Sequence, residues 1–230
     1  MPDILLIALV AGLLAIDDRA GWQSLLGEPI FSSLIVGVLL GAIEPALQCG
    51  VVLQLAWLSI GAARGTRRPN TVVGGVVGAG AVSLVLAANA RANESLVVAT
   101  GVLMGLAAAE VGALIGRAVG ELRERWLGDF TLPASYEVAS RKLAMTVLGS
   151  TVFVGLVDFV VVLLLLPLAA SAARLSSAHF GTGAATGAAW WLSCVAAIGI
   201  ASIMRAFGTR VLVRFLAAGA AAVALVGWLR

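Results

Sequence analysis

The sequence predicts an all-α, polytopic integral membrane protein with about six to nine membrane segments. Hydrophobic residues make up 61% of its 230 residues and charged residues only 12%, and the mean hydropathy is +1.06. Helices packed closely in lipid favour small residues, and the chain has 27 glycines. Its length favours a single transmembrane domain, residues 1–230.

Apolar runs separated by short polar loops predict where the helices lie. Residues 4–16 form the first run, and residues 21–29 suit a short amphipathic element at the membrane interface. Beyond residue 70 we expect spans at 72–90, 96–115, 143–168, 183–204 and a last one that ends near residue 228. Pro167 is expected to end the third of these, with a short loop around His179 after it.

The run of residues 31–63 is interrupted. As one helix its 33 residues would be about 50 Å long, against a hydrocarbon core of roughly 30 Å. Gly41 and Pro45 break the run, so it predicts two half-helices that meet near residues 41–45, or two tilted spans. Polar side chains in or beside it favour a wet cavity inside the protein, because lipid excludes them. The run is the candidate substrate path, and its polar side chains are Gln23, Glu44, Gln48 and Gln54.

Loop charges predict the orientation in the membrane. The arginine loop 64–68, the polar stretch 117–142 and the basic turn 205–214 are two spans apart from one another. They therefore fall on one side, which the positive-inside rule makes cytoplasmic. The basic residues are scattered through short loops with few aromatic neighbours, which argues against a nucleic-acid-binding protein.

Small residues and cysteines inside the spans predict packing. Glycines four apart, Gly74 with Gly78 and Gly101 with Gly105, allow helix backbones to approach closely. The two cysteines, Cys49 and Cys194, have no metal-ligating residues at suitable spacing and are expected to be buried small hydrophobes.

Two acids and a tryptophan pair also fall inside apolar spans. Glu110 and Asp158 are candidates for an intramembrane proton or cation relay. Each could equally pair with an arginine of a neighbouring span, and both interpretations stay open. Of Trp190 and Trp191, we expect one ring to pack in the bundle and the other to face lipid.

Residues 18–71 resemble the N-terminal signature of the membrane IIC subunit of the mannose/sorbose-type sugar phosphotransferase system (PTS). The spacing agrees through about fifty-five residues. The matched positions are Asp18-Arg19, Gln23, Pro29-Ile30, Gly37, Gly41, the sequence LQLAWL at 53–58, IGAA at 60–63, and Pro69-Asn70-Thr71.

The resemblance implies a multi-pass subunit of the bacterial inner membrane that carries a hexose or related sugar. It implies a hetero-oligomer with a IID-like membrane subunit, and soluble IIA and IIB phosphocarriers, of which IIB phosphorylates the sugar. It implies no cofactor, no metal and no catalytic residue in this subunit, so His179 is expected to have a structural role.

Several positions depart from the family's usual residues. Ala42, Gln54 and Asn70 stand where acids are usual, and Glu28 stands where a basic residue is usual. Amides hydrogen-bond sugar hydroxyls through both a donor and an acceptor without the cost of a buried charge. We therefore expect sugar contacts from Gln23, Gln54 and Asn70, with Glu44 and Gln48 as further candidates, and expect Gln54→Glu to keep or raise hexose affinity. The alternative is helix-to-helix hydrogen bonding.

Two other functions remain open from the sequence. The first is an ion-coupled secondary transporter of a small solute, in which Glu110 and Asp158 couple ion movement to transport. The second is a transport-inactive membrane scaffold that is derived from the permease and keeps only its partner surface.

Overall fold

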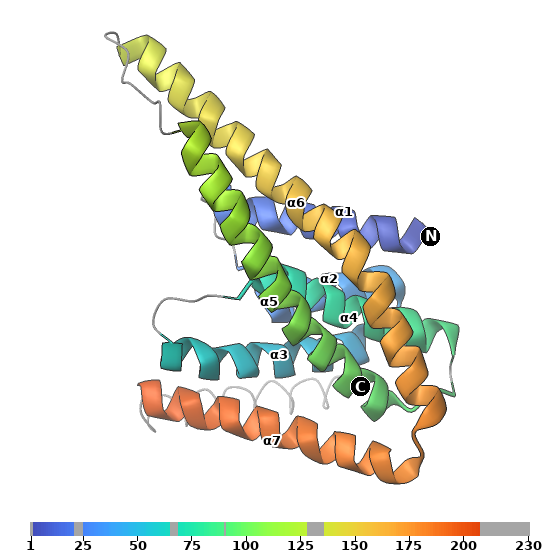
Figure 1. Ribbon diagram of the computed structural model, residues 1–230. Coiled ribbons are helices and arrows are strands. Elements are labelled where there is room, and N and C mark those ends of the chain that lie inside the picture. The colour runs from blue at the N-terminus through green and yellow to red at the C-terminus, as the bar shows by residue number, and fades with distance from the viewer. Residues whose placement is uncertain (1, 21–24, 65–68, 90, 128–135, 208–230) are drawn as a thin grey trace, which may run out of the picture.

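The computed structural model describes residues 2–20, 25–64, 69–89, 91–127 and 136–207, which form seven α-helices and no strand (Figure 1). This confirms the all-α prediction. Gln23 and the predicted last span lie outside the described residues. The helices are α1 (Pro2–Ala20), α2 (Pro29–Leu40), α3 (Ile43–Arg64), α4 (Thr71–Ala88), α5 (Glu94–Leu127), α6 (Tyr136–His179) and α7 (Thr182–Phe207).

Four stretches of these helices are long and apolar enough to cross a membrane, which confirms the membrane class. They are Thr71–Ala88, Glu94–Glu121, Ala144–His179 and Thr182–Ser202. Two shorter apolar helices, Pro29–Leu40 and Ile43–Leu58, come from the interrupted run. The chain is therefore a multi-pass membrane protein.

The interruption lies at Gly41, as the sequence predicted. Gly41 has a φ of 69° and caps α2 in the left-handed conformation that glycine adopts without strain. The Ala42 N–H then donates to the Gly37 carbonyl at 2.9 Å, and α3 begins one residue later. Pro45 falls in the first turn of α3, where its missing N–H costs little. The two helices thus form an antiparallel hairpin.

The α6 helix does not end at Pro167, so that prediction was wrong. It continues to His179, and no loop separates it from the end of the 143–168 run. Proline removes one helical hydrogen bond, but in lipid a whole unpaired turn of backbone costs more than that single bond. The Ser171 hydroxyl donates to the Pro167 carbonyl at 2.8 Å and stabilises the turn that follows.

Glycines let α4 lie against α5 at backbone distance, as predicted. A Cβ added at Gly105 would lie 2.8 Å from the Gly74 carbonyl oxygen, and one added at Gly78 would lie 2.9 Å from that of Gly101. This antiparallel register, together with its contacts to α2, α3 and α6, makes α4 the buried centre of the bundle.

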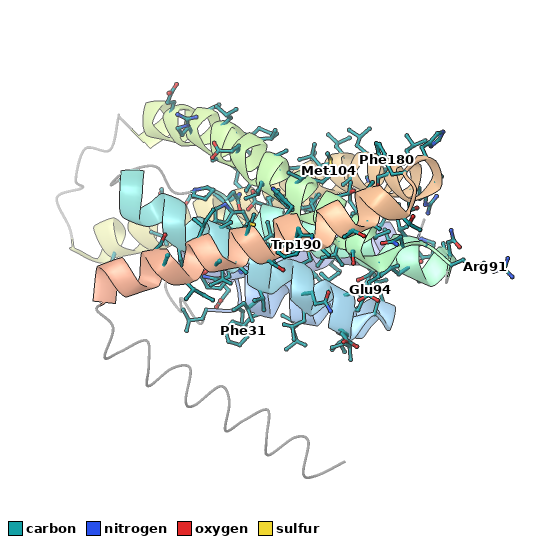
Figure 2. All side chains as sticks on the ribbon, turned by 90° about the horizontal axis from the view of Figure 1, so that it is seen from below. Phe31, Arg91, Glu94, Met104, Phe180 and Trp190 are labelled. Carbon is teal, nitrogen blue, oxygen red and sulfur yellow. The ribbon has the colours of Figure 1, made fainter. Side chains whose placement is uncertain are left out.

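The helices alternate between two ends of the bundle (Figure 1). At the left, α1, α3, α5 and α7 end and α2, α4 and α6 begin; we call this the arginine-rich end, because the predicted cytoplasmic loops flank it. The other is the far end, where Figure 2 places Arg91 and Glu94. The α5 and α6 helices, 34 and 44 residues long, extend together beyond the other helices at the arginine-rich end (Figure 1).

Side chains on α7 confirm one prediction and correct another. Trp190 is 71% exposed, whereas the partly buried Trp191 packs against the core, as expected for one ring that faces lipid and one that packs in the bundle. Cys49 is buried but Cys194 is exposed, so the prediction of two buried cysteines was wrong for Cys194. Lipid-facing and protein-facing positions are equally apolar, and hydropathy does not separate them.

Candidate functional site

A cavity of about 610 Å³ lies near the arginine-rich end and is lined by residues between 18 and 117, from the end of α1 to α5. This volume is within the range of small-molecule sites. Its lining combines two carboxylates, two amides, one guanidinium and one indole ring with small and apolar groups. The lining residues are Asp18, Glu28, Gln54, Trp57, Leu58, Pro69, Asn70, Thr71, Ala113, Gly116 and Arg117.

Gln54 enters this cavity from α3. Its Nε2 donates a hydrogen bond to Glu28 Oε2 at 2.9 Å, across the α2–α3 hairpin. Its Oε1 is buried and has no hydrogen-bond partner among the described residues. An unpaired buried acceptor costs free energy, which a hydrogen bond from a hydroxyl donor would offset.

Asn70 is fixed from three sides at the start of α4. Its backbone N–H donates to the Ala109 carbonyl of α5 at 3.1 Å. Its Oδ1 accepts the Val73 N–H at 3.1 Å, which makes it the N-cap of α4. Its Nδ2 donates to both carboxylate oxygens of Asp158 on α6, each at 3.0 Å. Gly112 leaves room for this arrangement, since a Cβ there would lie 3.0 Å from the Asn70 Cβ.

Sequence reasoning missed several lining residues, Trp57 above all. Its ring is 7% exposed and lies over Gly74, where an added Cβ would come within 2.5 Å of Cη2. Asp18 and Trp57 both belong to the stretch that carries the family resemblance, which was a usable signal. Arg117 was assigned only to the polar stretch, because a single sequence does not show that α5 passes the cavity.

The structure separates the other candidates from the cavity. Glu44 and Gln48 are exposed in the first two turns of α3, toward the far end, and Glu110 is half-buried on α5. Asp158 is not a lining residue, but it accepts hydrogen bonds from Asn70, which is one. A second cavity, of about 570 Å³, lies at the far end between Asp3, Leu40, Ala88 and Arg174 and contains none of the predicted site residues. Over the described ranges, no three His, Cys, Asp or Glu side chains gather to hold a metal ion.

The comparison with protein families decides the identity. The family described as the PTS system sorbose-specific IIC component matches residues 1–228. The chain belongs to this family. A search of curated proteins gives no match. As a IIC component, the chain is part of a sugar permease and works with other PTS components.

Two departures of this IIC component from the usual family residues are in contact with one another. Glu28 stands where a basic residue is usual and Gln54 where glutamate is usual, and their side chains share the hydrogen bond of 2.9 Å. A basic residue and a glutamate would attract each other at the same place.

Proposed function

We propose that this IIC component translocates a hexose or related sugar and presents it in the cavity at the arginine-rich end for phosphorylation by a soluble IIB partner. The observation that carries the proposal is the meeting of Gln54 and Asn70 in one cavity of about 610 Å³. Both are neutral amides from the matched family stretch, and amides suit the uncharged hydroxyls of a sugar. Gln23 is proposed as a third contact.

The indole ring of Trp57 supports a sugar ligand as well. Aromatic rings offer a broad apolar face, which fits the C–H face of a sugar ring while the amides bind its hydroxyls. The far-end cavity provides a place where a sugar could enter before translocation.

The position of His179 favours phosphorylation by a partner. This residue is the only histidine of the sequence; its Nδ1 lies 3.0 Å from the Leu175 carbonyl oxygen, in the last turn of α6 at the far end. A phosphoryl group would have to reach the sugar from another protein, and the cavity faces the end that we assign to the cytoplasm. We propose a IID-like membrane subunit and soluble IIA and IIB proteins as partners, in the bacterial inner membrane.

Transport in vesicles tests this proposal. Vesicles contain the chain with its co-expressed second membrane subunit, and phosphorylated IIB is enclosed inside. We expect labelled sorbose or mannose to accumulate as the sugar phosphate only when phosphorylated IIB is present. Uptake that depends on an ion gradient and not on IIB would show an ion-coupled transporter instead. No uptake of any hexose with all components present would support a scaffold.

A further inference from the structure

Two carboxylates hold the two cavity amides in defined orientations. Glu28 accepts a hydrogen bond from Gln54 Nε2 at 2.9 Å. Both carboxylate oxygens of Asp158 accept from Asn70 Nδ2, each at 3.0 Å. A carboxylate only accepts hydrogen bonds, so in each pair the amide nitrogen must face the acid. Neither amide is free to exchange its oxygen and nitrogen by rotation about its last bond.

This orientation leaves Gln54 as an acceptor. Its nitrogen is used by Glu28, and Oε1 is buried and lacks a hydrogen-bond partner among the described residues. A sugar hydroxyl that donates to Oε1 would satisfy it.

Asn70 is left as a donor. Its Oδ1 is used by the Val73 N–H. The two oxygens of one carboxylate lie too close together to receive two N–H groups that diverge from a planar nitrogen, so a single forked N–H serves both oxygens of Asp158. The second N–H has no other bond among the described residues, and Asn70 lines the cavity. A sugar hydroxyl that accepts from this N–H would satisfy it.

We infer that Glu28 and Asp158 are positioning residues, which make Gln54 the hydrogen-bond acceptor and Asn70 the hydrogen-bond donor for a neutral sugar. The inference rests on the proposed function and deepens it, because it assigns a polarity to each sugar contact. Asp158 is 2% exposed, and a carboxylate buried to that degree must be hydrogen-bonded. Its role is to orient Asn70, which differs from the ion relay that its sequence position suggested.

Swapping the acid and the amide within each pair should have different effects on sugar binding in the two pairs. Asn70→Asp with Asp158→Asn keeps the N-cap and the buried hydrogen bond, because aspartate caps helices well and an amide donates to it. It turns the group that faces the sugar into an acceptor, however. Glu28→Gln with Gln54→Glu also keeps its hydrogen bond, and there the group that faces the sugar remains an acceptor.

The experiment measures binding of labelled sorbose and mannose to the chain purified with its second membrane subunit, together with the thermal unfolding midpoint. We expect the Asn70/Asp158 exchange to unfold within about 3 °C of the parent protein but to lose about tenfold or more in affinity. The Glu28/Gln54 exchange should lose several-fold less affinity than the Asn70/Asp158 exchange. Asp158→Asn alone should also retain binding, since its amide oxygen accepts from Asn70, whereas Asp158→Leu should lose about tenfold.

Asn93→Asp is the matched control. Asn93 caps α5 through the Leu96 N–H at 3.2 Å, at the far end and away from the cavity, so binding should be unchanged. Parent-like binding by the Asn70/Asp158 exchange, or by Asp158→Leu, would overturn the inference while the proposed function stands. An equal loss of sugar affinity in both exchanges would also overturn it. If the Asn70/Asp158 exchange fails to fold, the two single variants test the inference, which requires Asp158→Asn to retain sugar binding and Asp158→Leu to lose it. A parent protein that binds no hexose would overturn the proposed function itself.

Discussion

Gln54 donates its side-chain amide to Glu28 across the α2–α3 hairpin, at 2.9 Å. Sequence reasoning expected Gln54→Glu to keep or raise hexose affinity, and this contact changes that expectation. The substitution would place two carboxylates at hydrogen-bond distance, where they cannot both stay ionised without repulsion.

We therefore predict that Gln54→Glu alone lowers affinity for sorbose or mannose about tenfold. Adding Glu28→Lys places opposite charges at the contact and should return the affinity to within about threefold of the parent. Equilibrium binding to the purified membrane complex measures both variants. If Gln54→Glu binds as the parent does and Glu28→Lys changes nothing, the Glu28 contact has no part in sugar binding.

The glycine contact between α4 and α5 predicts a large effect from a single methyl group. A Cβ at Gly105 would lie 2.8 Å from the Gly74 carbonyl oxygen, so Gly105→Ala should destabilise the protein by about 1–3 kcal/mol through overpacking. Gly120→Ala is the control on the same helix, because nothing lies within 4 Å of its added Cβ. It should leave stability unchanged or raise it by up to about 1 kcal/mol. Thermal unfolding in mild detergent compares them, and equal midpoints would contradict the close helix packing.

Membrane sidedness is predicted from the two ends of the bundle. Arg117 lies at the arginine-rich end and Arg174 at the far end. In a chain with Cys194→Ser, we expect an impermeant thiol reagent to label Arg117→Cys from the cytoplasm and Arg174→Cys from outside. Arg67 and Arg210, which lie outside the described residues, should behave as Arg117 does. Labelling of Arg67→Cys and Arg210→Cys from outside would invert the orientation and place the cavity away from a IIB partner.

We predict that the chain purifies as a complex with a second membrane subunit. The apolar span of α7 has only 11% of its residues buried within the chain, and PTS IIC components work with other PTS components. Size-exclusion chromatography after co-expression measures the association. A monodisperse single chain that binds sugar unaided would argue against a IID-like partner.

The sequence predicted local features of this fold better than its long-range contacts. Gly41 marked the hairpin turn because few residues besides glycine adopt a left-handed cap, and glycine spacing marked the α4–α5 contact. The prediction that the helix ends at Pro167 was wrong. Proline usually breaks helices in water, but in lipid the cost of unpaired backbone outweighs this effect.

The candidate site was predictable only in part. Gln54 and Asn70 stood out as polar residues in a matched apolar stretch, and both line the cavity. Their partners did not, since Asp158 is 88 positions from Asn70 and Glu28 is 26 from Gln54. Hydrophobic periodicity shows which face of a helix is apolar but not which side chain meets it across the bundle. Glu44 and Gln48 shared the polarity of Gln54 and lie toward the other end of the same helix.

Sugar binding by Gln54→Leu beside Gln48→Leu tests the central claim most directly. Both substitutions replace a glutamine of α3, but only Gln54 lines the cavity, while Gln48 is exposed toward the far end. We predict that Gln54→Leu weakens binding of sorbose or mannose by about 1–3 kcal/mol, or about five- to 150-fold, with the complex still assembled. Gln48→Leu should bind as the parent does. Parent-like affinity in Gln54→Leu, or an equal loss in both variants, would contradict a sugar site in this cavity.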